Sequence, residues 1–226
     1  MELLSNGFTL EISPGAFPLS TDSVLLADFT KLPKNARVLD LGSGCGTLGI
    51  YLCAKDPGCH VTGIELSEQA HLAALHNIEA NALSHRMKSI CADLRTVPAE
   101  QTFDVCISNP PYFSGGPASK TVPDARRNDS CSTQELLSAA DRALRYGGDL
   151  FLVQKPELLA EICACASAAH LEPKRLRLIR HRTGGDISLI LLQCRKGGKP
   201  GLSWEELCLF TENGEPTPYY RELYHL

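Results

Sequence analysis

The segment "VLDLGSGCGTLGI" (38–50) decides the fold that the sequence predicts. It begins inside the apolar, β-rich run "ARVLDLG" (36–42), which indicates a buried strand. The stretch "GTLGIYLCAKD" (46–56) indicates the helix that follows. The turn between them carries three glycines, which let a backbone approach a ligand where any Cβ would collide. A strand, a glycine turn and a helix in this order predict an α/β fold with a ligand-binding loop.

The alternation of β-rich runs with amphipathic helical stretches continues along the chain and predicts a parallel sheet. Further strands are expected at 60–66, 87–93, 103–109, 147–154, 173–182 and 186–195. The last two are joined by the short turn Thr183-Gly184-Gly185, which can connect only antiparallel neighbours. The sequence therefore predicts a Rossmann-like sheet of seven mostly parallel strands, with an antiparallel last strand and helices on both faces.

The length of 226 residues suits a single domain. A core is expected over 36–196, preceded by a strand–helix extension over 1–35 and followed by a C-terminal extension over 197–226. Ser20 or Thr21 is expected to cap the first helix, and the capping box that runs from Ser132 to Glu135 opens a later one.

Composition is that of an ordinary globular protein, with 43% hydrophobic and 21% charged residues. There is neither a run of about eighteen apolar residues nor a signal-like start, so we expect a cytoplasmic protein without a membrane span. The ten cysteines are spread along apolar runs without metal-binding spacing, which favours reduced thiols and no metal. The sequence leaves the oligomeric state open.

The glycine turn has the pattern D-x-G-x-G-x-G, formed by Asp40, Gly42, Gly44 and Gly46. The dinucleotide fingerprint would need a small residue at position 47, where Thr47 stands. An acid directly before the glycines would repel a phosphate and attract a cation. S-adenosylmethionine carries an ammonium and a sulfonium, so the loop favours this cofactor.

Two further acids follow the next two predicted strands. Glu65 ends the second strand, where a carboxylate can accept both ribose hydroxyls. Asp93, followed by Leu94, ends the third, where it can accept from the exocyclic amine of the cofactor's adenine. Because the carboxyl ends of parallel strands meet at one edge, we expect these residues and the glycine loop to form one cofactor site.

The fourth predicted strand ends in Asn109-Pro110-Pro111-Tyr112. Asn109 would face the cofactor's methyl group. Its side-chain oxygen and the Pro110 carbonyl can accept the N–H bonds of an amide or aryl amine, which returns electron density to the nitrogen. The proline rings of Pro110 and Pro111 aim these acceptors in advance, and Tyr112 offers a flat surface for a planar substrate.

Together, D-x-G-x-G-x-G and N-P-P-Y resemble the class I S-adenosylmethionine-dependent amino-group methyltransferases. Further similarity, to the bacterial tRNA(Val) adenine-N6 methyltransferase group, covers nearly the whole chain. It rests on "FPLSTDSVLLADF" (17–29), "LEPKRLRLIRHR" (171–182), "GDISLILLQCRKGGKPGL" (185–202) and "TENGEPTPYYRELY" (211–224). This resemblance implies a single-domain enzyme that methylates the N6 of an anticodon-loop adenine in tRNA.

Two basic segments are candidates for binding that RNA. Where the group carries A-R-H-E, this chain reads Ala125-Arg126-Arg127-Asn128-Asp129, so that Arg126 is retained and the His-Glu pair is not. Residues 171–200 hold eight Lys or Arg against two acids, a balance of +6 in a chain of net charge −4. We expect Arg177 and Arg180 of this segment to border the N-P-P-Y crevice and contact phosphates.

Three other functions fit parts of the pattern. A glutamine N5-methyltransferase of release factors uses the same N-P-P-Y logic, but that family normally has a helical N-terminal domain. A ribosomal-RNA guanine-N2 methyltransferase tends to have a duplicated domain and a Phe where Tyr112 stands. A non-catalytic binding module is disfavoured by the intact set of Asp40, Glu65 and N-P-P-Y.

Overall fold

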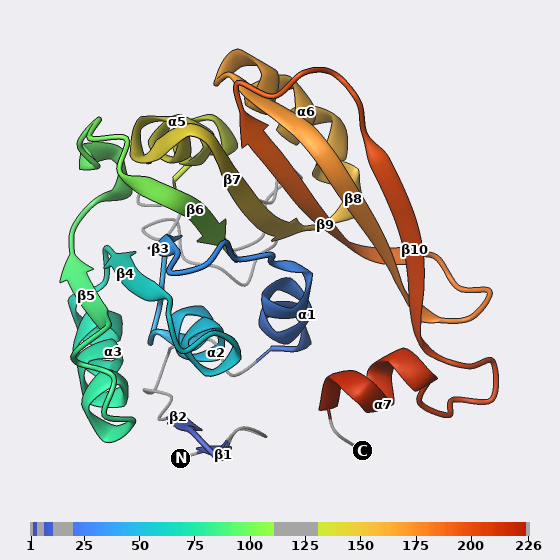
Figure 1. Ribbon diagram of the computed structural model, residues 1–226. Coiled ribbons are helices and arrows are strands. Elements are labelled where there is room, and N and C mark those ends of the chain that lie inside the picture. The colour runs from blue at the N-terminus through green and yellow to red at the C-terminus, as the bar shows by residue number, and fades with distance from the viewer. Residues whose placement is uncertain (1, 4–6, 11–19, 111–130, 225–226) are drawn as a thin grey trace, which may run out of the picture.

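The computed structural model describes residues 2–3, 7–10, 20–110 and 131–224, and one eight-stranded sheet forms its centre (Figure 1). The strand order is β10-β8-β9-β7-β6-β3-β4-β5. The strands are β3 (Arg37–Leu41), β4 (His60–Glu65), β5 (Met87–Cys91), β6 (Phe103–Ser108), β7 (Leu144–Gln154), β8 (Leu171–Arg182), β9 (Ile187–Lys196) and β10 (Ser203–Phe210).

The predicted sheet is confirmed, with one correction. β9 is antiparallel to both β7 and β8, and the other neighbouring strands are parallel. The predicted number of seven strands is wrong, because the C-terminal extension adds β10 parallel to β8. The sequence pattern does not predict this strand, because the first half of the strand is exposed and contains the acids Glu205 and Glu206. Those acids pair with arginines of β8, which offsets their unfavourable effect on a strand.

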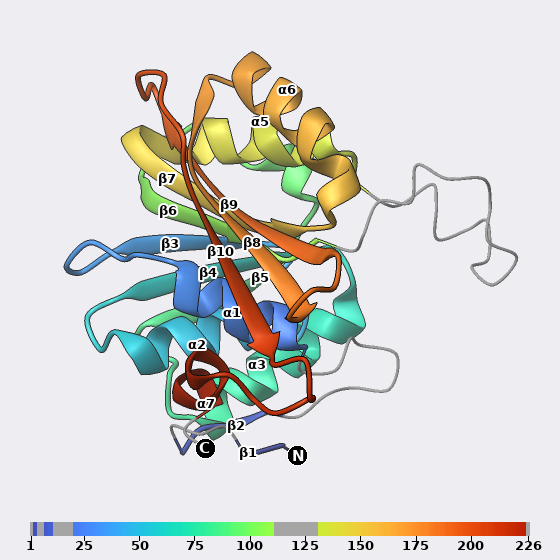
Figure 2. The ribbon, with the colours of Figure 1, turned by 90° about the vertical axis from the view of Figure 1, so that its right-hand side faces the viewer.

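Helices cover both faces of the sheet, as predicted (Figures 1 and 2). α5 and α6 lie on one face, and α1, α2, α3 and α7 lie on the other. The helices are α1 (Thr21–Phe29), α2 (Thr47–Lys55), α3 (Glu68–Ala80), α5 (Thr133–Ala143), α6 (Leu159–Ala168) and α7 (Pro218–Tyr224), with short 3-10 turns η1 (Leu94–Thr96) and η2 (Pro156–Leu158). A separate two-stranded ribbon pairs β1 (Glu2–Leu3) with β2 (Thr9–Leu10).

The helix starts follow the predicted capping chemistry. Ser20 caps α1, and its side chain accepts from the backbone N–H of Ser23. Ser132 and Glu135 form the complete capping box at α5. Each such cap contributes about 0.5–2 kcal/mol relative to alanine.

Helix α1 is held against the sheet by aromatic packing. Phe29 meets Phe151 of β7 edge to face, with ring centroids 5.9 Å apart, and both side chains are buried. Burying such a side chain contributes about 1.5–3 kcal/mol. The C-terminal end of α1 is therefore fixed against β7. Among the described residues, no helix is long and apolar enough to cross a membrane.

All ten cysteines lie in the described part of the chain and are free thiols there. Those that are buried are Cys45, Cys53, Cys59, Cys106 and Cys194. Burial raises the pKa of the Cys106 thiol well above its ordinary value, so this group packs as a small neutral hydrophobe.

Candidate functional site

The glycine loop between β3 and α2 has the geometry that the sequence predicts. Gly42, Gly44 and Gly46 have φ angles of 74°, 54° and 87°, in the left-handed region that favours glycine. A Cβ added to Gly46 would lie 3.1 Å from the Cε of Met87, whereas one added to Gly42 or Gly44 would meet no atom within 4 Å. The first two glycines therefore border open space in which a ligand can approach the backbone.

Asp40 lies fully buried at the end of β3, directly before this loop. Neither of its carboxylate oxygens has a hydrogen-bond partner among the described residues. Burial and, secondarily, the nearby Glu65 carboxylate raise the pKa of Asp40 to about 7. The Gly49 N–H, which makes no hydrogen bond of ordinary geometry to the carboxylate, lowers the pKa of Asp40 and so opposes this shift. A buried carboxyl without a partner is costly, and a bound cation would relieve that cost. The Asp40 carboxylate is therefore suited to bind the ammonium of S-adenosylmethionine.

Glu65, the last residue of β4, shapes the same loop. Its Oε2 accepts from the Gly44 N–H at 2.8 Å, and its Oε1 accepts from the Ser67 N–H at 2.8 Å. One carboxylate thus ties the glycine loop to the start of α3. Each oxygen keeps a further lone pair, so the expected bonds to ribose hydroxyls remain possible and stay a prediction.

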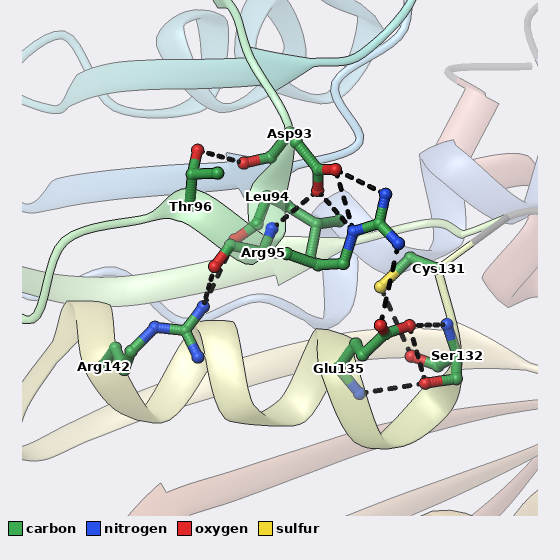
Figure 3. Close-up of polar contacts among 8 residues, drawn as sticks. All are labelled: Asp93, Leu94, Arg95, Thr96, Cys131, Ser132, Glu135 and Arg142. Atoms are coloured by element: carbon green, nitrogen blue, oxygen red, sulfur yellow. Dashed lines mark hydrogen bonds and ion pairs between the residues drawn. The ribbon is translucent and has the colours of Figure 1, made fainter. Parts of the chain in front are cut away.

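Asp93 lies beyond β5, at the edge that carries Glu65, and begins η1 (Figure 3). Arg95 grips its carboxylate, with distances of 2.9 and 2.8 Å from Nε to the two oxygens and 2.5 Å from Nη2. These bonds lower the pKa of Asp93. Arg95 also lies 3.8 Å from Glu135 of α5, and Leu94 offers its carbonyl to Arg142 at 3.4 Å. The predicted bond from Asp93 to a cofactor amine stays a prediction, and Arg95 would compete with it.

Asn109 follows β6 and is half-buried at the same edge. The sheet register pairs Asp40 with Gly63 of β4 and with Ile107 of β6. Glu65 and Asn109 each come two residues after those partners, so both lie at the carboxyl edge of the sheet beside the glycine loop. The Nδ2 of Asn109 donates to the Oγ of Ser23 on α1 at 2.9 Å, which leaves the side-chain oxygen as acceptor. Ser23 is 7% exposed, so this anchor is shielded from water.

Ser23 is the site residue that sequence reasoning missed. It belongs to the quoted segment 17–29, but its contact partner Asn109 is 86 residues away in the sequence. The available signal was a serine inside the otherwise apolar run that follows the helix cap. Pro110 is buried, whereas Pro111, Tyr112 and Arg126 lie outside the described residues, so their predicted roles stay predictions.

Arg177 and Arg180 have protein partners in this structure. Arg177 donates to Asp28 and Glu205, each at 2.8 Å, and its side chain is only 12% exposed. Arg180 binds Glu206 at 2.5 Å and also donates to the Gly185 carbonyl. The predicted phosphate contacts of both arginines stay predictions. In this structure their charges are paired with carboxylates of α1 and β10. A separate groove of about 500 Å³ lies at the opposite edge of the sheet, lined by Arg37, His60, Lys88 and neighbours. None of the predicted site residues that the structure describes lines this groove.

Comparison with known proteins agrees with this geometry. The family model described as "Methyltransferase small domain" matches residues 18–164. A tRNA1(Val) (adenine(37)-N6)-methyltransferase from Tolumonas auensis is 32% identical over 212 residues, covering 91% of this chain and 87% of the relative.

Two solved structures share the fold. One is described as a predicted O-methyltransferase from Agrobacterium tumefaciens, with a TM-score of 0.76 at 24% identity over 91% of this chain and 96% of that one. The other is the T. thermophilus 16S rRNA N2 G1207 methyltransferase in complex with AdoMet and guanosine, with a TM-score of 0.60 at 25% identity. That match covers 84% of this chain and 47% of the other.

The family match spans the glycine loop, both strand-end acids and Asn109, the same residues that meet at the carboxyl edge of the sheet. The resemblance that the sequence predicted is thereby confirmed. This chain belongs to the methyltransferase small domain family.

Proposed function

We propose that this chain transfers a methyl group from S-adenosylmethionine to the N6 amino group of an adenine in tRNA. The observation that carries the proposal is the Asn109 amide, whose nitrogen is anchored on Ser23 while its oxygen is left as an acceptor beside the glycine loop. The name of the Tolumonas auensis relative supports the choice of tRNA and of adenine N6.

The cofactor site is formed by the carboxyl edge of β3, β4 and β5. When bound, S-adenosylmethionine supplies a methyl group on a positively charged sulfur. Asp40 would hold the ammonium with its unpartnered carboxylate, and Gly42 and Gly44 would let the backbone approach. Glu65 would accept from the ribose with its remaining lone pairs. Asp93 and Leu94 would lie along the adenine, after Arg95 has given up part of its hold on Asp93.

The reacting nitrogen is a poor nucleophile, because its lone pair is delocalised into the adenine ring. Asn109 Oδ1 and the Pro110 carbonyl would accept its two N–H bonds, which favours the tetrahedral nitrogen of the transition state. Transfer would break the bond between the methyl carbon and sulfur and form the bond between that carbon and N6. One N–H proton would pass to water, and S-adenosylhomocysteine would be the second product. Pro111 would stiffen the loop and Tyr112 would stack on the base.

The tRNA is held, in this proposal, by Tyr112 and Arg126 near the base and by basic residues that include Arg177 and Arg180. The chain acts as one methyltransferase domain, since β10 and α7 of the C-terminal extension join the sheet and the α1 face. We propose that it works in the cytoplasm.

The direct test is to incubate the protein with labelled S-adenosylmethionine and unmodified tRNA1(Val), then to identify the labelled nucleoside after digestion. We expect N6-methyladenosine from the wild type and almost none from Asn109→Ala. Parallel reactions contain 16S rRNA or a release factor. The first of these matters because the T. thermophilus relative is an rRNA guanine-N2 methyltransferase. Label in N2-methylguanosine or in a glutamine side chain would refute the proposal.

A further inference from the structure

A cavity of about 230 Å³ is lined in part by α1, the helix whose Ser23 bonds to Asn109, and it has no role in the cofactor site. Its walls come from α1, from Lys155 after β7, from the end of β8 and the start of β9, and from the C-terminal segment. The polar and aromatic residues that line it include Asp22, Lys155, His181, Phe210 and Tyr220.

The cavity lies at the same edge of the sheet as Asn109. Asp22 occupies the first turn of α1, next to Ser23, whose hydroxyl accepts from Asn109 Nδ2. Lys155 directly follows β7, the neighbour of β6 in the sheet. A nucleotide chain that presents one base to Asn109 can therefore reach the cavity with an adjacent base.

One wall of the cavity is aromatic. The ring centroids of His181 and Phe210 are 5.0 Å apart, and those of Phe210 and Tyr220 are 4.7 Å apart. His181 is exposed, and Phe210 and Tyr220 are half-buried. Such a row of rings supplies the flat faces on which unstacked RNA bases are bound.

The other wall is polar and contains the carboxyl group of Asp22 and the ammonium group of Lys155. Burial raises the pKa of Asp22, and the nearby Lys155 ammonium opposes that rise. A carboxyl and an ammonium side by side can satisfy the acceptors and donors along the edge of a nucleobase. The volume is below the roughly 300–1,000 Å³ of sites for drug-sized ligands, which suits one planar base better than a larger molecule.

We propose that this cavity binds the base of a nucleotide next to the methylated adenine, in a single-stranded RNA loop. His181, Phe210 and Tyr220 stack on that base, while Asp22 and Lys155 bond to its edge. The inference rests on the proposed function. It gives the C-terminal segment a role in substrate selection, because an RNA must splay two neighbouring bases to fill both positions.

The test measures binding of an RNA stem-loop with the anticodon-arm sequence of tRNA1(Val), in the presence of S-adenosylhomocysteine. Stacking on one base is worth about 1–3 kcal/mol, so Tyr220→Ala should weaken binding roughly 5- to 150-fold. Tyr220→Phe should bind as the wild type does, because it keeps the ring. His181→Ala, at an exposed position, should weaken binding in the same direction. The control is Trp204→Ala, which removes an exposed ring at the other end of β10 and should have no effect.

The second arm replaces the bases on either side of the target adenine, one at a time, with abasic sites. One of these abasic RNAs should bind the wild-type protein as weakly as the intact RNA binds Tyr220→Ala. The same abasic RNA should bind Tyr220→Ala no more weakly than it binds the wild type. Unchanged binding in both Tyr220→Ala and His181→Ala, or fully additive losses, would overturn the inference. Methyl transfer by the wild type to the same stem-loop is assayed in parallel. Absence of transfer to any RNA would refute the proposed function and the inference with it, whereas transfer with unaffected variants would refute the inference alone.

Discussion

Polar side chains at the carboxyl ends of β3 and β6 differ from those on β8 in how many protein partners they have. At the carboxyl ends of β3 and β6, Asp40 is buried without a hydrogen-bond partner among the described residues, and Asn109 is anchored to Ser23 through the nitrogen of its amide. On β8, in contrast, Arg177 and Arg180 are bound by carboxylates of α1 and β10. Buried polar groups are normally satisfied, so an orphaned one needs a reason. Asp40 lies directly before the family's glycine loop and Asn109 lies at the same edge of the sheet, whereas Arg177 and Arg180 join β8 to α1 and β10.

The largest expected effect concerns the cost of leaving Asp40 unpartnered. Its pKa is about 7 in the folded chain and 3.8 as a free group. Raising the pH from about 4 to 7 therefore ionises the unfolded chain first, and the folded protein loses on the order of 4 kcal/mol of stability. Asp40→Asn has no such group. Urea unfolding of the cofactor-free proteins should show the variant gaining on the wild type as pH rises, and a pH-independent difference would contradict this account.

The next largest effect is expected on catalysis by Asn109. Asn109→Ala should lower turnover by about two orders of magnitude, since removing one aimed polar group costs roughly 2.7–4 kcal/mol in the transition state. Affinity for S-adenosylmethionine should stay near the wild-type value, because the amide acts mainly in the transition state. Single-turnover methyl transfer and calorimetry measure the two quantities. Asn213→Ala, an exposed asparagine in the C-terminal turn, is the matched control.

Substitution of the ion-paired arginines on β8 should lower stability instead. Arg177→Gln should destabilise the protein by about 1–3 kcal/mol, because Asp28 and Glu205 lose their 2.8 Å ion pairs. Asp28 then still accepts from the Tyr219 hydroxyl, and Glu205 still lies 3.8 Å from Arg175. Arg180→Gln, whose ion pair is more exposed, should cost less than about 1 kcal/mol. Urea unfolding measures both effects, and RNA binding at several salt concentrations sharpens the test. If either variant flattened the salt dependence without a loss of stability, the sequence-based phosphate role would be favoured over the scaffold role.

The smallest effect is expected at the anchor of the catalytic amide. Ser23→Ala removes one neutral hydrogen bond, worth about 0.5–1.5 kcal/mol, and should slow turnover roughly two- to tenfold. The KM values for RNA and cofactor should not change, and Ser23→Thr should restore the rate because it keeps the hydroxyl. A change in KM alone would show that Ser23 serves binding and not the orientation of Asn109.

The sequence sufficed for features that depend on neighbouring residues. The glycine loop, the strand-end acids, the Ser132–Glu135 capping box and the parallel sheet follow from local pattern and spacing, and the structure has all of them. Contacts between distant segments were not predictable. Ser23 and Asn109 are 86 residues apart, and Arg177 and Asp28 are 149 apart.

The same limit explains the missed strand and the basic segment. The +6 balance of residues 171–200 looked like a surface for RNA because the acids of β10 lie outside that window. Only the parallel pairing of β10 with β8 brings Glu205 level with Arg177. A charge count along one segment therefore overstates the free charge of a strand that another segment covers.

The most direct measurement is calorimetric titration of S-adenosylmethionine into the wild type, Asp40→Asn and Arg180→Gln under one set of conditions. The account predicts one cofactor per wild-type chain and the same affinity for Arg180→Gln. Asp40→Asn should bind roughly tenfold or more weakly, since a charged hydrogen bond is worth about 1.5–3 kcal/mol. Wild-type affinity in Asp40→Asn would contradict the claim that the unpartnered carboxylate holds the cofactor's ammonium.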